Sequence, residues 1–231
     1  MSHIPNNIEH IRTRIREAAL TAGRNPGDIT LVAVSKRQSI ADIEDAYNAG
    51  QRHFGENYAQ ELRDKAVALS HLTDIQWHFI GNLQKNKVKY VVANASMMEC
   101  IDSFSIAEEF SKRAKGANRT LDALLQVNVG REPQKSGCMP DDAAAIMSNI
   151  RLLPNIRLRG LMTVPPFHLE AAETRLVFRE LAALRDALGG KDALPELSMG
   201  MSHDFEEAIW EGATLVRVGT AIFGERPPKS W

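Results

Sequence analysis

A lysine follows a short β-branched segment near the start of the chain, in the sequence ITLVAVSK (29–36). Because side chains alternate between the two faces of a strand, Lys36 shares a face with Val32 and Val34. An amine held among apolar side chains loses part of its proton affinity and becomes a better nucleophile toward a carbonyl. Schiff-base chemistry is one interpretation of Lys36. The other is a loop lysine that reaches solvent beside Arg37.

Two segments near the end of the chain have the residue types of a phosphate site, SMGMS (198–202) and RVGT (217–220). Glycine lets a ligand approach the backbone closely. In α/β barrels, phosphate commonly binds to backbone N–H groups in the loops after the last two strands. Gly200 and Gly219 suit tight turns equally well, so neither glycine decides the matter by itself.

Ser202 precedes an expected helix in which Asp204 and Glu207 would form a variant capping box. Its hydroxyl and the neighbouring N–H groups are suited to a phosphate at the start of that helix. The simpler alternative is that Ser202 only caps its own helix. The local sequence leaves both interpretations open.

Arg217 lies in the apolar segment LVRVGTAIF (215–223), on the same strand face as Gly219. A permanent charge among apolar residues is costly unless it is paired. A structural ion pair with a carboxylate at a strand end is one interpretation. The functional interpretation places the guanidinium against a ring nitrogen of a bound cofactor.

These residues need a scaffold that brings strand ends together, and the chain alternates between strand-like and helix-like segments. Strands are expected at residues 29–36, 53–56, 76–80, 97–101, 121–129, 156–164, 196–199 and 215–223. Helices are expected at residues 5–22, 39–50, 57–70, 84–93, 104–116, 140–150, 168–188 and 203–211. This order predicts one domain over residues 1–231, an α/β fold of the (β/α)8 TIM barrel type with one extra N-terminal helix. An open doubly wound sheet is the alternative, which the absence of the Rossmann and P-loop glycine motifs weakens.

The composition points to a protein that handles small molecules. The chain has 231 residues, and 28 Lys and Arg nearly balance 29 Asp and Glu, with no concentrated run of one sign. This balance argues against a nucleic-acid or membrane partner. Cys100 and Cys138 have no metal-type or disulfide-type spacing, so we expect reduced thiols. With no signal-like segment at the N-terminus, we expect a cytoplasmic protein.

Seven motifs, spread in order over nearly the whole chain, together carry a family resemblance. They are AVSK (33–36), HFGENY (53–58), WHFIGNLQKNK (77–87), KSG (135–137), RGLMT (159–163), SMGMS (198–202) and RVGTAIFG (217–224). In these motifs the chain resembles the pyridoxal 5′-phosphate (PLP) homeostasis proteins, also called proline synthase co-transcribed homologues. That family in turn resembles the N-terminal barrel of alanine racemase.

The resemblance implies a cofactor and a set of binding residues. It implies PLP held on Lys36 as an internal aldimine (a Schiff base), with Arg217 facing the pyridine nitrogen. It implies further that Ser202, Gly219 and Thr220 hold the phosphate, and it implies no metal.

Weaker expectations concern residues near the ends of other strands. Asn57 and His78 would line the PLP ring, although a helix cap and a satisfied core histidine are equally good interpretations. Gly200 is a further candidate for cofactor contact. Lys135, in a loop, is either a second amine for PLP transfer or a solvated lysine.

The same residues argue against catalytic turnover. An arginine beside the pyridine nitrogen disfavours its protonation and leaves a weak electron sink. The chain has three tyrosines, Tyr47, Tyr58 and Tyr90, and all fall in or beside expected helices, so none suits the second acid/base of a racemase. We also expect that no second domain follows the eighth strand. This leaves the cofactor open to release.

We therefore expect a non-catalytic PLP-binding protein that acts in vitamin B6 and amino-acid homeostasis, with apo PLP-dependent enzymes as possible recipients and a monomeric state. A PLP-dependent amino-acid racemase is the main alternative. A cofactor-free Schiff-base lyase is the third.

Overall fold

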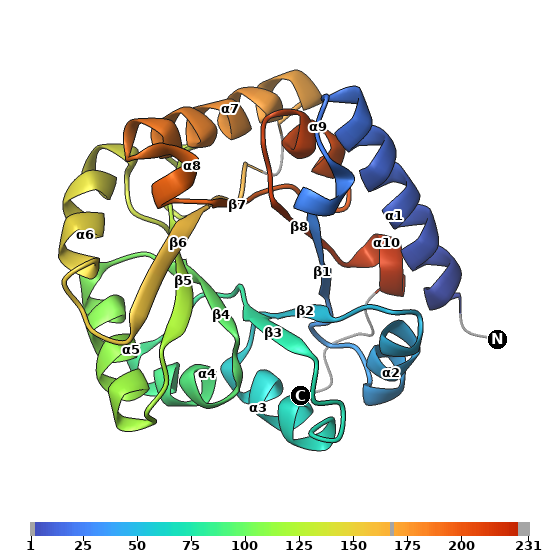
Figure 1. The fold of residues 1–231 in the computed structure, drawn as a ribbon, viewed down its shortest axis with the longest axis horizontal. Coiled ribbons are helices and arrows are strands. Elements are labelled where there is room, and N and C mark those ends of the chain that lie inside the picture. Colours follow the sequence, from blue (N-terminus) through green and yellow to red (C-terminus); the bar gives the residue numbers. More distant parts are fainter. Residues whose placement is uncertain (1–2, 167–168, 226–231) are drawn as a thin grey trace.

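Eight parallel strands close into a barrel (Figure 1). The computed structural model describes residues 3–166 and 169–225. The strands are β1 (Thr30–Val34), β2 (His53–Glu56), β3 (Gln76–Phe79), β4 (Met97–Ile101), β5 (Leu121–Gln126), β6 (Ile156–Met162), β7 (Glu196–Ser198) and β8 (Leu215–Val218). Each strand pairs with the next, and β8 pairs with β1, Ala33 lying opposite Val218. The expected (β/α)8 barrel is therefore confirmed.

Helices surround the barrel on the outside (Figure 1). They are α1 (Ile4–Thr21), α2 (Ile40–Asn48), α3 (Ala59–Ala68), α4 (Val88–Asn94), α5 (Phe104–Gly116), α6 (Ala143–Ile150), α7 (Ala171–Ala187), α8 (Gly190–Ala193), α9 (Phe205–Trp210) and α10 (Thr220–Phe223). Short 3-10 turns occur at η1 (Pro26–Asp28), η2 (Lys85–Lys87) and η3 (Pro140–Asp142). In the described part of the chain, no helix has the length and apolar character needed to span a membrane.

The extra N-terminal helix is present as α1. Its apolar stripe, which includes Ile4, Ile8, Ile11 and Ile15, is buried. The helix packs against α2, α9 and α10, so it covers the place where the first and last strands meet. Burial of this stripe explains why a helix that precedes the first strand is part of the fold.

One expected element is wrong. The strand expected at 215–223 ends at Val218, and Thr220–Phe223 form α10 instead. The N–H groups of Ile222 and Phe223 both donate to the Gly219 carbonyl, so the chain turns into a helix just after the register with β1 ends. The helix expected at 168–188 is α7, which begins at Ala171; residue 168 lies outside the described residues.

The inside of the barrel holds an apolar layer and a polar layer. Val32, Leu124, Met162 and Leu215 pack together inside the barrel, separately from the larger core between strands and helices. Filling of this kind is usual for eight strands, whose interior has room for side chains and no channel. Buried polar side chains, among them His78 on β3, Glu99 on β4, Ser198 on β7 and Arg217 on β8, form the second layer. That residues 1–231 form a single domain stays a prediction.

Candidate functional site

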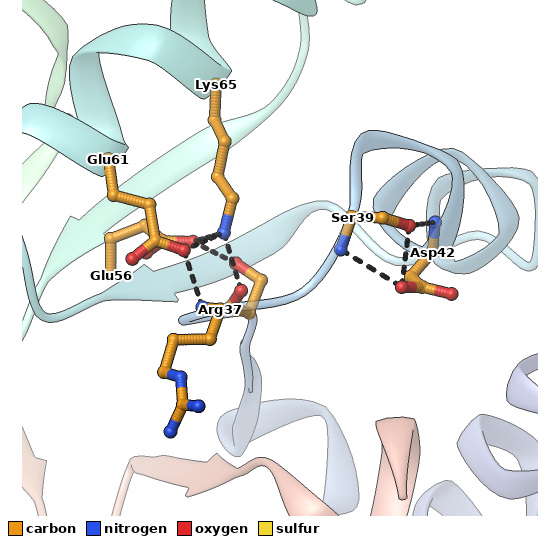
Figure 2. A network of polar contacts seen from close by, with 7 residues as sticks. Arg37, Ser39, Asp42, Glu56, Glu61 and Lys65 are labelled. Carbon is orange, nitrogen blue, oxygen red and sulfur yellow. Dashed lines mark hydrogen bonds and ion pairs between the residues drawn. The ribbon is translucent and has the colours of Figure 1, made fainter. Parts of the chain in front are cut away.

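Lys36 lies in a turn at the carboxyl end of β1, two residues beyond Val34. Its side chain is half-buried. The next residue, Arg37, has a φ of 63°, in the left-handed region that non-glycine residues adopt at a cost. A capping box between Ser39 and Asp42 then starts α2 (Figure 2). The lysine is thus on a short turn between two well-defined elements.

A cluster of four residues, three of them buried and one half-buried, anchors this turn; Figure 2 shows its polar contacts. We call Ser35, Glu56, Glu61 and Lys65 the anchor cluster. Lys65 Nζ from α3 donates to the Ser35 carbonyl at 2.6 Å, to Glu56 Oε1 at 2.8 Å and to Glu61 Oε1 at 2.6 Å. Ser35 Oγ donates to Glu56 Oε1 at 2.6 Å. The cluster therefore joins β1, β2 and α3.

Glu61 also holds the strained part of the turn. Its Oε1 accepts the backbone N–H of Arg37, the residue with the left-handed φ. A turn that is costly by itself persists when surrounding contacts determine it. The position of Lys36 thus depends on α3 as well as on its own strand.

Burial changes the acid–base behaviour of Glu56. Desolvation raises the pKa of Glu56 to about 7, against the opposing charge of Lys65. Its second oxygen, Oε2, is buried without a hydrogen-bond partner among the residues that the structure describes. The anchor cluster was not among the features predicted from the sequence. The available signal was Glu56 itself, a carboxylate at the end of the short expected strand HFGE (53–56).

The expected phosphate residues lie together at the ends of β7 and β8. The Gly219 N–H donates to Ser202 Oγ at 3.2 Å, and Thr220 Oγ1 lies 3.3 Å from the same oxygen. Because β8 neighbours β1, this group and Lys36 follow adjacent strand ends on one side of the barrel. An amine and a group of hydroxyl and N–H donors thus share the barrel mouth.

Ser202 is not the cap of the following helix. The residue before α9 is Asp204, whose Oδ1 accepts the Met201 N–H, and α9 has no side-chain cap. The capping interpretation of Ser202 is therefore wrong. Gly200 has a φ of +93°, and a Cβ there would lie 2.6 Å from Ala208 Cβ. Glycine is therefore required by the tight turn at this position.

Arg217 lies inside the barrel, only 4% exposed. Its Nη1 donates to Ser198 Oγ at 2.5 Å, and its Nη2 donates to the Thr163 carbonyl at 2.8 Å. Burial lowers the pKa of Arg217, while the charges of Glu99 and Asp204 act in the opposite direction. These two bonds use two of the five guanidinium N–H groups, and Nε–H is among those with no bond to a described residue. A ligand that reaches the guanidinium can accept from it.

Asn57 and His78 occupy different places. Asn57 follows β2, and its Oδ1 is buried without a hydrogen-bond partner in the described ranges. Tyr58, not Asn57, is the cap residue of α3. His78 lies within β3, and its ring nitrogens contact Glu99 Oε1 at 2.6 Å and His53 Nδ1 at 2.9 Å. Asn57 thus has an acceptor to offer a ligand, whereas both nitrogens of His78 have protein partners.

Lys135 is not a solvated loop lysine. Its Nζ donates to the Pro165 carbonyl at 2.6 Å and pairs with Glu132 Oε2 at 2.8 Å. These contacts hold the loop after β5 against the end of β6.

The geometry fits a phosphorylated heteroaromatic aldehyde. Lys36 offers the amine, and Ser202, Gly219 and Thr220 offer hydroxyl and N–H groups for a phosphate. The unused donor of Arg217 suits a ring nitrogen that accepts a hydrogen bond. The unpartnered Oδ1 of Asn57 is a buried polar atom of the kind that a bound ligand satisfies.

Comparison with known proteins gives the same assignment. The sequence model of the alanine racemase N-terminal domain matches residues 4–227. The pyridoxal phosphate homeostasis protein of Pseudomonas aeruginosa is 44% identical over 226 residues, which are 98% of this chain and 97% of that protein. The PLP-bound structure of PipY from Synechococcus elongatus is 39% identical, with a TM-score of 0.81 over 91% of this chain and 100% of PipY.

An alanine racemase of Clostridium difficile matches 96% of this chain and 57% of its own with a TM-score of 0.72, but at 14% identity it shows only a shared fold. The P. aeruginosa protein matches at far higher identity and over nearly its full length. The resemblance seen in the sequence motifs is therefore confirmed. This chain belongs to the pyridoxal phosphate homeostasis protein family.

Proposed function

We propose that this protein binds PLP through Lys36 and holds and releases it in PLP homeostasis, without catalytic turnover. The observation that carries the proposal is the placement of the Lys36 turn beside the Ser202, Gly219 and Thr220 group, at the ends of adjacent strands. The relatives named as pyridoxal phosphate homeostasis proteins and the PLP-bound PipY structure support it.

Each site residue has one task in this proposal. PLP, when bound, supplies an aldehyde that forms a reversible covalent bond with an amine. Lys36 provides that amine, and Ser202, Gly219 and Thr220 bind the phosphate. Arg217 donates to the ring nitrogen. Asn57 contacts the ring, and the backbone at Gly200 contacts the cofactor.

The proposal of no turnover rests on Arg217 and on the tyrosines. A guanidinium beside the ring nitrogen disfavours protonation of that nitrogen, so the cofactor withdraws electrons weakly. Tyr47 and Tyr90 lie on α2 and α4, and Tyr58 is 51% exposed before α3. The racemase alternative is therefore not favoured. A cytoplasmic location, a monomeric state and the recipient enzymes stay predictions.

Covalent trapping tests the binding proposal. The purified protein is loaded with PLP, treated with borohydride, digested and analysed by mass spectrometry. The adduct is expected on the peptide that contains Lys36 and is expected to be lost in Lys36→Ala. Lys112→Ala, which changes an exposed lysine on α5, is the matched control. An adduct of wild-type yield in Lys36→Ala would overturn the assignment.

Proton exchange tests the absence of turnover. The loaded protein is incubated with a panel of L-amino acids in D2O, and exchange at the α-carbon is followed by NMR. Exchange no faster than with free PLP is expected. Sustained exchange above that level would favour the racemase alternative.

A further inference from the structure

A chain of hydrogen bonds, partly buried at His53 and buried beyond it, crosses the inside of the barrel from β2 to β8. His53 Nδ1 lies 2.9 Å from His78 Nε2, and His78 Nδ1 lies 2.6 Å from Glu99 Oε1. Glu99 Oε2 accepts from Ser198 Oγ at 2.5 Å, and Ser198 Oγ accepts from Arg217 Nη1 at 2.5 Å. We call these five residues the interior chain. None of them is joined to the anchor cluster by these bonds.

The chemistry of the donors determines the direction of the three bonds that link His78, Glu99, Ser198 and Arg217. Arg217 can only donate, so Ser198 Oγ accepts from it and gives its single proton to Glu99. Glu99 then accepts on its other oxygen from His78 Nδ1–H. His78 Nε2 and His53 Nδ1 share the remaining hydrogen bond, whose direction depends on the tautomers of the two rings. Both arms of the chain therefore end on the carboxylate of Glu99.

The charges agree with this direction. Burial alone raises the pKa of Glu99, but the hydrogen bond and charge of His78, the charge of Arg217 and the Ser198 hydroxyl together lower it below its ordinary value. Burial and the neighbouring His78 lower the pKa of His53 to about 4. At neutral pH, Glu99 is thus an anion and His53 is neutral.

Glu99 and Arg217 also compensate each other's buried charge. Their strands, β4 and β8, lie on opposite sides of the closed barrel, and both side chains are buried. A buried cation without a compensating anion is strongly destabilising. The Ser198 hydroxyl joins the two groups, and its bond to Nη1, together with the bond from Nη2 to the Thr163 carbonyl, orients the guanidinium. The N–H groups that these bonds do not use, Nε–H among them, are oriented at the same time.

We propose that Glu99 is the positioning residue of the ring-nitrogen site: through Ser198 it orients Arg217 and balances its charge. The inference rests on the proposed function, because it assigns Arg217 to the nitrogen of bound PLP. Glu99 itself touches no ligand in this account. Its effect on cofactor binding passes entirely through the guanidinium.

The test compares PLP with 1-deazapyridoxal 5′-phosphate, in which a C–H replaces the ring nitrogen. Ser198→Ala removes the joining hydroxyl, and Glu99→Gln replaces one acceptor oxygen by a donor. The loss of a hydrogen bond to a charged group predicts that each variant binds PLP about tenfold more weakly. Affinity for the deaza compound is expected to stay at the wild-type value, and the absorption bands of bound PLP are expected to change. Ser111→Ala, which removes a buried serine hydroxyl bonded to the Pro154 carbonyl, is the matched control.

Two results would overturn the inference. One is wild-type PLP affinity and absorption in Ser198→Ala. The other is an equal loss of affinity for PLP and for the deaza compound, which a merely structural role of the interior chain predicts. If Glu99→Gln does not fold, Ser198→Ala decides by itself. The borohydride adduct on Lys36 of the wild-type protein is measured in parallel, so failure of the proposed function is recognised separately.

Discussion

Lys65 and Glu56 form an ion pair inside the fold, next to the turn that carries Lys36. Lys65 Nζ lies 2.8 Å from Glu56 Oε1, and the two side chains are 7% and 0% exposed. The same amine donates to the Ser35 carbonyl, one residue before Lys36. A second lysine, which makes no contact with a ligand in our proposal, thus holds the backbone of the first.

Replacing Lys65 by methionine is expected to destabilise the protein strongly. The substitution leaves two carboxylates, Glu56 and Glu61, without their shared cation. Removing one partner of a buried ion pair costs about 3 kcal/mol or more. Urea denaturation measures this loss in the free energy of unfolding. Lys112→Met, at an exposed position on α5, is the control, and a cost for Lys65→Met as small as that of the control would contradict the anchoring role.

Glu56 makes stability depend on pH. Its pKa rises from 4.5 to about 7 on folding, so the folded state binds this proton more tightly than the unfolded state. The stabilisation is therefore complete below the ordinary pKa and is lost as pH rises through the folded value, by at most about 1.4 kcal/mol per pH unit.

Glu56→Gln removes this contribution. The advantage in unfolding free energy of the wild type over Glu56→Gln is expected to shrink from acid to alkaline pH across that window. The measurement is denaturant unfolding in a series of buffers. Glu17→Gln, at an exposed position on α1, is expected to show no such trend. A wild-type advantage in unfolding free energy that grows with pH would contradict the expected direction of this pH dependence.

Ser202→Ala tests the phosphate assignment. The hydroxyl accepts from the Gly219 N–H and lies beside the Thr220 hydroxyl. Loss of one hydrogen bond to a charged phosphate predicts about tenfold weaker PLP binding. Binding of pyridoxal, which has no phosphate, is expected to stay unchanged. Spectroscopic titration of both ligands measures this, with Ser148→Ala on the exposed side of α6 as the control. Equal weakening of PLP and pyridoxal binding would contradict a contact between Ser202 and the phosphate.

Gly200→Ala is expected to destabilise the loop after β7. The φ of +93° disfavours a side chain, and the new Cβ would lie 2.6 Å from Ala208 Cβ and 2.9 Å from Phe205 Cα. Such strain costs about 1–3 kcal/mol. Gly116→Ala at the end of α5 meets no atom within 4 Å and is the matched control. Thermal unfolding of both variants measures the difference, and an unchanged Tm in Gly200→Ala would disprove the strain.

Elements governed by local patterns were predictable. The strands expected at 53–56 and 97–101 and the helix expected at 104–116 coincide with β2, β4 and α5. The strand expected at 215–223 failed because Thr220–Phe223 have strand-like residues but no strand partner. Strand length is decided by pairing in the sheet, which a local pattern does not contain.

The sequence by itself determined the order of the eight strands and the residues that follow them. It therefore predicted that Ser202, Gly219 and Thr220 meet at one end of the barrel, because parallel strands present their carboxyl ends on the same side. Only the tertiary structure decided that Ser202 faces Gly219 rather than capping α9.

The tertiary structure alone also placed Lys65 next to the Lys36 turn and joined Glu99 to Arg217 through Ser198. The physical reason is that periodicity tells which face of a strand or helix a side chain occupies. Which residue it meets across a closed barrel depends on strand register and curvature, and these are properties of the assembled sheet.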